Sequence, residues 1–307
     1  MSWELLKRNL KPIVIYLNIF GLMPVSVNNS NFKISKFQII YSVILELINI
    51  CYYSVKFQFS SVKSLDSVND FALTSQILSF AMLTSLSHFA FLCRSTTLSK
   101  IWFQIFKLSK ELSDKRIYKK IYRVVFCEVV VSIFFVIIFN INIFVFQSDI
   151  YDSFISIFEL LMSNRWYFHL FGIHIFFFNI LIFCNEILKL ANEELNQISE
   201  IDYVIGVMER QKVKENKNIS SVVLKFRNVA DLCDDANTCF GPAFTVSCSL
   251  TLFQLIIGCY YISRGWTLLY LMFLWILSFI LNLWIVLFAC EIIMAQVIFL
   301  IFLIFVK

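Results

Sequence analysis

The sequence predicts an all-α fold: a polytopic transmembrane helical bundle with six spans, a truncated C-terminal apolar tail and long helices that extend into the cytosol. Hydrophobic residues make up 59% of the chain and charged residues only 15%, whereas a globular domain has about 25% charged residues. The apolar residues gather in six runs, each near the roughly 20 residues that cross about 30 Å of hydrocarbon. The whole chain has only 6 Gly and 3 Pro, which favours uninterrupted helices.

Charge in the loops predicts the orientation of the spans. The loop at residues 94–123 holds nine Lys or Arg and two acidic residues, so we expect it in the cytosol. The amino terminus and the charged loop before the fifth span then lie on the same side, and Asn28 and Asn218, which begin glycosylation sequons, should carry no sugar. The predicted spans are Phe37–Val55, Phe71–Cys93, Val124–Phe146, Trp166–Cys184, Cys239–Ile262 and Trp266–Cys290.

The spans and loops divide the chain into five expected segments. Between the spans, apolar periodicity predicts cytosolic helices, and the stretch from Pro12 to Met23 predicts an interfacial or re-entrant helix because it is too short to cross. The segments are a cytosolic or interfacial N-terminal segment (1–35), spans one to four with a cytosolic helical extension at 94–123 (36–184), a cytosolic helical anchor loop (185–238), spans five and six (239–291) and an apolar tail (292–307).

The cytosolic segments carry apolar stripes at helical spacing. After the second span, which we expect to continue straight into the cytosol, the stripe contains Leu98, Ile101, Ile105 and Leu108. Two more stripes flank a polar run, Arg210–Asn218, which we expect to break the helix. Each stripe either packs within the chain or joins subunits. The predicted oligomer-anchor residues are Leu195, Ile198, Ile205 and Phe226.

Several classes of protein are disfavoured by the motifs. The nine cysteines contain no C-x-x-C pair, so we expect free thiols and neither a disulfide framework nor a zinc site. The three histidines, His88, His169 and His174, lie in predicted spans without a metal-binding pattern. No nucleotide-binding loop or catalytic constellation is found. We therefore expect no enzyme activity, no cofactor, no metal and no nucleic-acid partner.

Glu46 is the most informative residue within the spans. A charged side chain near the middle of a bilayer costs about 3 kcal/mol on insertion scales, so Glu46 should face the interior of the bundle, paired or protonated. It either lines a ligand cavity or ion path, or makes a structural hydrogen bond between helices. Other polar and aromatic residues in the outer halves of the spans extend the candidate ligand site, although those at span ends also fit interfacial anchoring. The predicted ligand-binding residues are Glu46, Gln76, Asn140, Trp166, Gln254 and Tyr260.

The sequence resembles the insect gustatory receptors over most of its length. The resemblance rests on the order and spacing of short matches and on an amino terminus that faces inward. These matches are Lys11-Pro12, Gly21-Leu22-Met23-Pro24, Asn237-Thr238-Cys239-Phe240-Gly241 and Ala289-Cys290-Glu291. The resemblance implies a tastant-gated, nonselective cation channel of the plasma membrane, acting in taste perception as a homo- or hetero-tetramer with a ligand pocket in the outer half of each subunit.

One departure from that family bears on the pore. The family's Thr-Tyr signature, which precedes Gln-Phe in a pore-lining seventh span, is absent. As a helix, residues 292–306 would reach about 22 Å, short of the bilayer. The expectation is a truncated or alternatively spliced product. Two alternatives therefore stay open: an isoform that only assembles with or regulates full-length receptors, and a proton-coupled transporter that uses Glu46.

Overall fold

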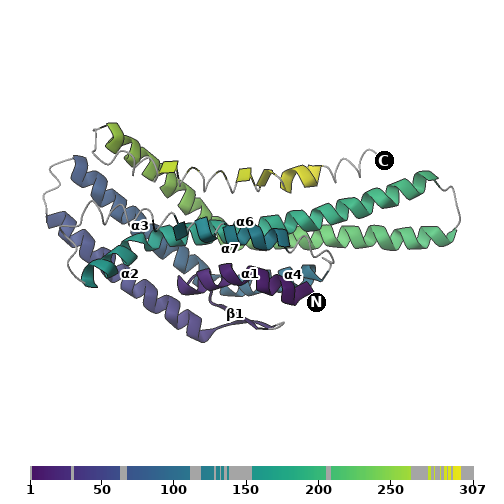
Figure 1. The fold of residues 1–307 in the computed structure, drawn as a ribbon, viewed down its shortest axis with the longest axis horizontal. Coiled ribbons are helices and arrows are strands. Elements are labelled where there is room, and N and C mark those ends of the chain that lie inside the picture. Colours follow the sequence, from purple (N-terminus) through teal and green to yellow (C-terminus); the bar gives the residue numbers. More distant parts are fainter. Residues whose placement is uncertain are drawn as a thin grey trace.

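The computed structural model is a bundle of long α-helices with one small β-hairpin (Figure 1). It describes residues 2–28, 31–62, 68–110, 119–127, 154–204 and 209–263, with shorter stretches among residues 129–137 and 276–298. Residues 119–127 are helical. The other helices are α1 (Ser2–Ile19), α2 (Lys36–Val62), α3 (Val68–Cys93), α4 (Ser95–Ser109), α6 (Phe154–Val204) and α7 (Glu209–Ser263), and the strands are β1 (Val25–Asn28) and β2 (Asn31–Ile34).

Three helices of the described part of the chain are long and apolar enough to cross a membrane. They contain Lys36–Val55, Phe171–Gln197 and Ser220–Tyr260. Two shorter apolar helical stretches are Leu10–Ile19 and Leu78–Cys93. This is the architecture of an all-α helical membrane protein. The predicted third and sixth spans fall largely outside the described residues, so the number of six spans stays a prediction.

The two longest helices, α6 and α7, each join a predicted span to a predicted cytosolic helix without interruption. They contain 51 and 55 residues and run side by side (Figure 1). The polar run Arg210–Asn218, expected as a break, is helical in the structure. Lys, Glu, Gln and Arg are good helix formers, and polarity alone does not end a helix when Pro and Gly are absent from the run.

The N-terminal segment is more regular than expected. Helix α1 begins ten residues before Pro12 and ends at Ile19, where Gly21 adopts a φ of 70°. A left-handed glycine is a common end of a helix because it has no Cβ. The chain then forms the antiparallel hairpin, with Val25 opposite Ile34 and Asn28 opposite Asn31. Alternating β-branched residues after Pro24 favour this strand pairing, which the sequence analysis missed.

A cluster of aromatic side chains lies at the centre of the bundle and contacts four helices. Trp102 of α4 stacks on Phe176 of α6, with ring centroids 5.4 Å apart. Phe240 of α7 meets both Phe176 and Phe91 of α3 edge-on, each at 5.2 Å. Trp102 and Phe91 are only 1% exposed. Offset and edge-to-face contacts of this kind add to the burial of apolar surface, so this cluster fixes α3, α4, α6 and α7 relative to one another.

Helix α4 follows α3 after a one-residue interruption at Arg94, whose φ and ψ are −108° and 22°. The second span therefore does not continue as one regular helix. The apolar stripe on α4 is buried within the chain, from Leu98 to Leu108. Its polar side contacts α7, because Lys100 and Gln104 both donate to Asp235, at 2.8 and 2.7 Å. The hydrogen bond to Asp235 raises the pKa of the exposed Lys100 ammonium.

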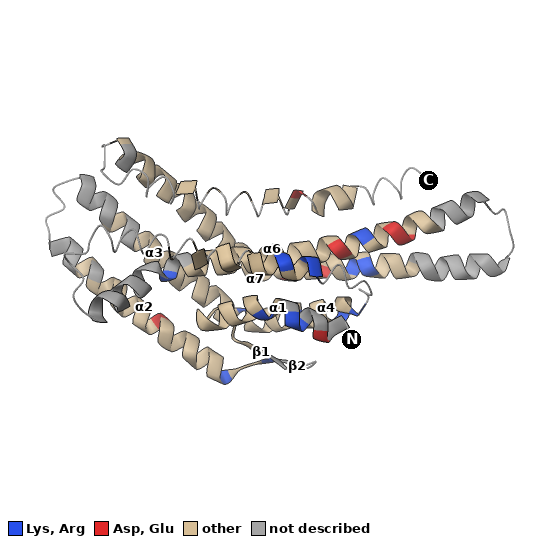
Figure 2. Ribbon diagram, viewed as in Figure 1, with Lys and Arg blue, Asp and Glu red and all other residues tan. Residues whose placement is uncertain are grey.

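Charged residues gather toward one half of the bundle. Among the described residues, Lys, Arg, Asp and Glu lie mostly along one half of α6 and α7 and on α1 (Figure 2). Several pair between elements: Lys120 meets the nearly buried Glu186 at 2.6 Å, and Lys225 of α7 contacts Glu194 of α6. Such segregation of charge separates a water-facing half from an apolar half.

Cys184 of α6 and Cys233 of α7 offer a direct test of the packing of these two helices. Their Sγ atoms are 3.8 Å apart, and a disulfide bond of about 2.05 Å requires only a small further approach. We expect copper-phenanthroline to join them within one chain, as measured by mass spectrometry of peptides after alkylation. Cys184→Ser should abolish the cross-link, whereas Cys127→Ser should not. If both thiols stay open to alkylation after oxidation, the side-by-side arrangement is wrong.

Candidate functional site

A cluster of polar side chains lies between α2, α3 and α6, around Glu46. One carboxylate oxygen of Glu46, Oε1, accepts hydrogen bonds from Ser85 Oγ at 2.5 Å and from Asn49 Nδ2 at 3.4 Å. Asn49 also donates to Thr84 Oγ1 at 2.8 Å. Asn49 and Thr84 are fully buried. Glu46 therefore faces other helices, as predicted, and these bonds tie α2 to α3.

The second carboxylate oxygen of Glu46 lies close to two nitrogenous side chains. Arg165 Nη2 of α6 is 3.7 Å from Oε2, and His88 Nδ1 of α3 is 3.4 Å from it. Arg165 also donates to the backbone carbonyl of Leu45. His88 in turn lies beside His169, with ring centroids 4.9 Å apart. Oε2 is buried and has no hydrogen-bond partner in the structure, so its contacts with Arg165 and His88 are electrostatic.

Helix α1 and the residues after it close one side of this cluster. The Ser42 hydroxyl of α2 donates to the carbonyl of Gly21. A Cβ on Gly21 would lie 3.0 Å from His88 Nε2 and 3.1 Å from Ser42 Oγ. Glycine is therefore required here both for its positive φ and for the close approach of the backbone to His88.

The ion pair of Glu46 and Arg165 within this cluster lies inside the bundle and not at its surface. The side chains of Arg165 and Glu46 are 5% and 14% exposed. Removing one partner of a buried pair is strongly destabilising because the other charge stays without a counter-ion. The pair therefore ties α2 to α6, while His88 and Ser85 bring α3 to the same point.

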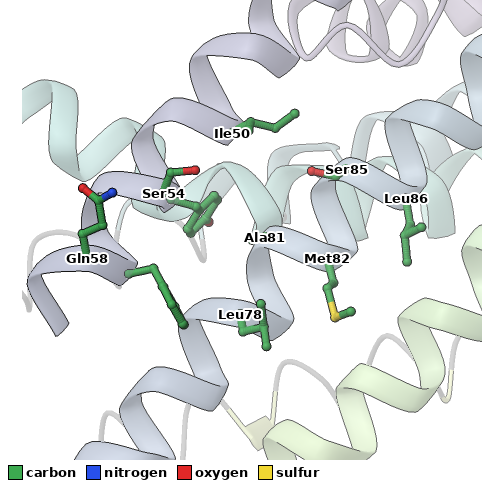
Figure 3. A pocket seen from close by; sticks show the side chains of 10 residues that line it. Ile50, Ser54, Gln58, Leu78, Ala81, Met82, Ser85 and Leu86 are labelled. Carbon is green, nitrogen blue, oxygen red and sulfur yellow. The ribbon is translucent and has the colours of Figure 1, made fainter. Parts of the chain in front are cut away.

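A groove lies next to the cluster, between α2 and α3, with a volume of about 530 Å³. Small-molecule sites usually measure about 300–1,000 Å³. Ser85 belongs to both features, because it lines the groove and donates to Glu46. Figure 3 shows side chains from both helices around this space. The lining residues are Ile50, Tyr53, Ser54, Phe57, Gln58, Leu78, Ala81, Met82, Ser85 and Leu86.

The three predicted ligand-binding residues whose side chains are described, Glu46, Gln254 and Tyr260, do not all lie at the groove. Glu46 adjoins the groove, as described. Gln254 of α7 is buried and donates its amide to Ser79 of α3, which is six residues, or about 9 Å of helix, from Ser85. Tyr260 lies near the end of α7 and its carbonyl accepts from Ser263. Neither Gln254 nor Tyr260 lines the groove.

Three further predicted ligand residues lie beyond the described side chains. Gln76 belongs to α3 and Trp166 to α6, but only their backbone is described. Asn140 falls outside the described residues. Their roles in ligand binding stay predictions.

The predicted anchor residues that are described pack within the chain. Leu195 contacts the small buried cluster of Ala191 and Val222 between α6 and α7, and Phe226 packs against the main core. Ile198 is helical with its side chain outside the description, and Ile205 lies outside the described residues. Packing within the chain accounts for the two stripes at these positions, and the oligomer stays a prediction.

The role of Arg165 was not predicted. The fourth span was predicted to begin at Trp166, one residue later, which leaves Arg165 outside the span. In the structure Arg165 is 4% exposed and belongs to α6. A lone Arg beside one span and a lone Glu inside another is a signal of a pair between helices, since each charge lowers the energy of burying the other. Within the described part of the chain, no three His, Cys, Asp or Glu side chains lie close enough to hold a metal ion.

The fold and the site together define a helical membrane protein with a polar cluster inside its bundle. The sequence matches the family of 7tm chemosensory receptors over residues 10–301, nearly the whole chain. The chain belongs to this family. The match confirms the resemblance to insect gustatory and chemosensory receptors that the sequence analysis drew from short motifs. No curated protein matches the sequence.

Proposed function

We propose that this chemoreceptor is a subunit of a tastant-gated, nonselective cation channel in the plasma membrane. The observation that carries the proposal is the groove between α2 and α3, which shares Ser85 with the Glu46–Arg165 pair. A ligand in the groove would contact a residue that donates to the ion pair joining α2 and α6. Occupancy of the groove is thereby coupled to the relative positions of these helices, as a receptor requires.

The remaining parts of the proposal have separate support. The segregation of charge to one half of the bundle (Figure 2) favours a cytosolic amino terminus, because Lys and Arg are retained on that side. Assembly as a homo- or hetero-tetramer with other receptor subunits, and a total of six spans, follow from the resemblance and from the apolar runs of the sequence.

Recording of ligand-evoked current tests the proposal. We expect cells that express the chain together with other members of the family to give a cation current on addition of one or more compounds from a panel of sugars, bitter compounds and long-chain alcohols. Glu46→Gln should reduce that current, whereas Glu193→Gln, at an exposed position of α6, should not. If surface labelling shows the protein at the membrane but no compound evokes current with or without other subunits, the channel proposal is wrong.

The same cells separate the receptor from two alternatives. Current from this chain alone would show that it needs no other subunit. If the other subunits give the same ligand-evoked current without this chain, and the chain changes only its size, the chain is an assembling or regulatory isoform. For a proton-coupled transporter, substrate uptake should follow the proton gradient and disappear in Glu46→Gln without any ligand-gated current.

A further inference from the structure

We propose that the groove between α2 and α3 binds an uncharged amphipathic molecule that enters from the lipid: a hydrocarbon chain carrying one acceptor oxygen, which accepts a hydrogen bond from the hydroxyl of Tyr53. As the ligand class of the receptor, this inference rests on the proposed function.

The groove has an apolar lining with a polar element inside it. Six of its ten lining residues have hydrocarbon or thioether side chains, and the other four are Tyr53, Ser54, Gln58 and Ser85. None of the ten is charged. A carboxylate or ammonium group would therefore lose its water without gaining a counter-ion in the lining, which is unfavourable at membrane depth. An uncharged ligand follows.

Tyr53 is the reason to expect an oxygen on that ligand. Its side chain is only 7% exposed, and its hydroxyl is buried without a hydrogen-bond partner in the structure. Buried tyrosine hydroxyls usually have a partner, and leaving one without a partner is unfavourable by about 1–3 kcal/mol. Tyr53 lines the groove, so a rotation of its ring would bring the buried hydroxyl to a ligand there, which would supply the missing acceptor.

The lipid side is the open side of the groove. Ile50, Phe57 and Met82 line it and are 47%, 43% and 51% exposed. All three lie on helices, α2 and α3, that carry further apolar residues beyond the groove. In a membrane such side chains face hydrocarbon. Figure 3 shows Met82 and Leu86 projecting from α3 beside this space, opposite Ser54 and Gln58 of α2. A ligand dissolved in the bilayer reaches the groove without crossing the core of the bundle.

An acyl tail of ordinary phospholipid fits this site less well than an alcohol does. Its ester oxygens are fixed at the depth of the headgroup, whereas the oxygen of a free alcohol can take the depth of Tyr53, which lies two residues inside the end of the apolar stretch at Val55. A long-chain alcohol or carbonyl compound brings a chain for the apolar lining and an oxygen for the hydroxyl. The distinction between these two occupants is the core of the test.

The test uses the full chain, purified and placed in phosphatidylcholine nanodiscs, with tetradecanol that carries a photoreactive diazirine and an alkyne. We expect labelled peptides from α2 and α3 around the groove. Unlabelled tetradecanol should compete with the probe, and tetradecane should compete poorly. Tyr53→Phe should weaken the competition by tetradecanol about three- to tenfold, the loss expected for one neutral hydrogen bond, and leave that by tetradecane unchanged.

A matched pair of substitutions separates the groove from the rest of the lipid-facing surface. Met82→Trp places a large ring in the groove and should abolish the labelling. Leu252→Trp makes a comparable change at an exposed position of α7, 57% exposed, and should leave it intact. Because Met82 and Leu252 are 51% and 57% exposed, neither substitution should disturb the core. Both variants should therefore keep the thermal unfolding temperature of the parent protein.

Several results would overturn the inference. Equal competition by tetradecane and tetradecanol, or equal labelling of Met82→Trp and the parent protein, would identify nonspecific contact with the lipid-facing surface. Failure here is distinct from failure of the receptor proposal. Tyr53-dependent binding without any evoked current would contradict the channel alone. Evoked current that is unchanged in Met82→Trp would contradict the groove as the ligand site in both proposals and leave the channel standing.

Discussion

Glu46→Gln is expected to lower the free energy of unfolding by about 2–3 kcal/mol, somewhat less than for a fully dry pair. The amide keeps hydrogen bonds to Ser85 and Asn49 but no longer neutralises Arg165, whose guanidinium is 5% exposed and 3.7 Å from the carboxylate. Thermal unfolding of the protein in detergent, followed by tryptophan fluorescence, measures the change. Arg165→Gln alone should be destabilising by a similar amount, since it leaves the carboxylate without its cation.

The double variant Glu46→Gln/Arg165→Gln decides whether the two charges act as a pair. Removal of both charges should restore most of the stability lost in either single variant, because no uncompensated charge remains. Glu193→Gln, at an exposed position of α6, is the matched control and should change stability by less than about 0.5 kcal/mol. A double variant whose loss equals the sum of the two single losses would show that the pair has no coupling.

Trp102→Ala is expected to lower the stability by about 3–5 kcal/mol, because it removes a large side chain that is 1% exposed and leaves a cavity in the core. The substitution removes the stacking contact with Phe176 and thereby weakens the association of α4 with α6. Thermal unfolding measures the loss, and trypsin cleavage near Lys107 reports the release of α4. Trp102→Phe should lose less than half as much stability as Trp102→Ala, since it keeps an aromatic ring stacked on Phe176.

The neighbouring residue of α4 supplies the control for this substitution. Phe103 is 53% exposed, so Phe103→Ala should change the stability by less than about 0.5 kcal/mol and should not increase trypsin cleavage. Equal effects of the two substitutions would show that α4 is not docked through Trp102.

The apolar periodicity of the sequence predicted the helices well, but it does not predict which helices contact one another. The stripe on α4 is buried where its spacing indicated, because the same face of a helix recurs every three to four residues. The helix break predicted at the polar run after Glu209 was wrong, since low hydrophobicity says little about backbone conformation. The hairpin after Pro24 was missed because an alternation of only four residues in each strand is a weak signal.

The candidate site shows the same division between local and long-range information. Burial cost alone predicted that Glu46 faces a partner. The identity of that partner, Arg165, depends on how α2 and α6 pack, over a separation of more than one hundred residues. The groove depends likewise on the spacing of α2 and α3, and none of its lining residues except Tyr53, Ser54, Gln58 and Ser85 carries polar chemistry that a sequence pattern could single out.

The unbroken length of α6 also matters mechanically. From Arg165 to the contact of Glu194 with Lys225 the helix rises about 44 Å, and α6 as a whole is about 75 Å long, well over the thickness of the hydrocarbon layer. It contains no proline, so it behaves as a stiff lever. A tilt of about 5° at Arg165 would move the Glu194–Lys225 contact sideways by about 4 Å over the roughly 44 Å between them. A small rearrangement at Glu46 is thus amplified, without any hinge, at the charged end of the molecule.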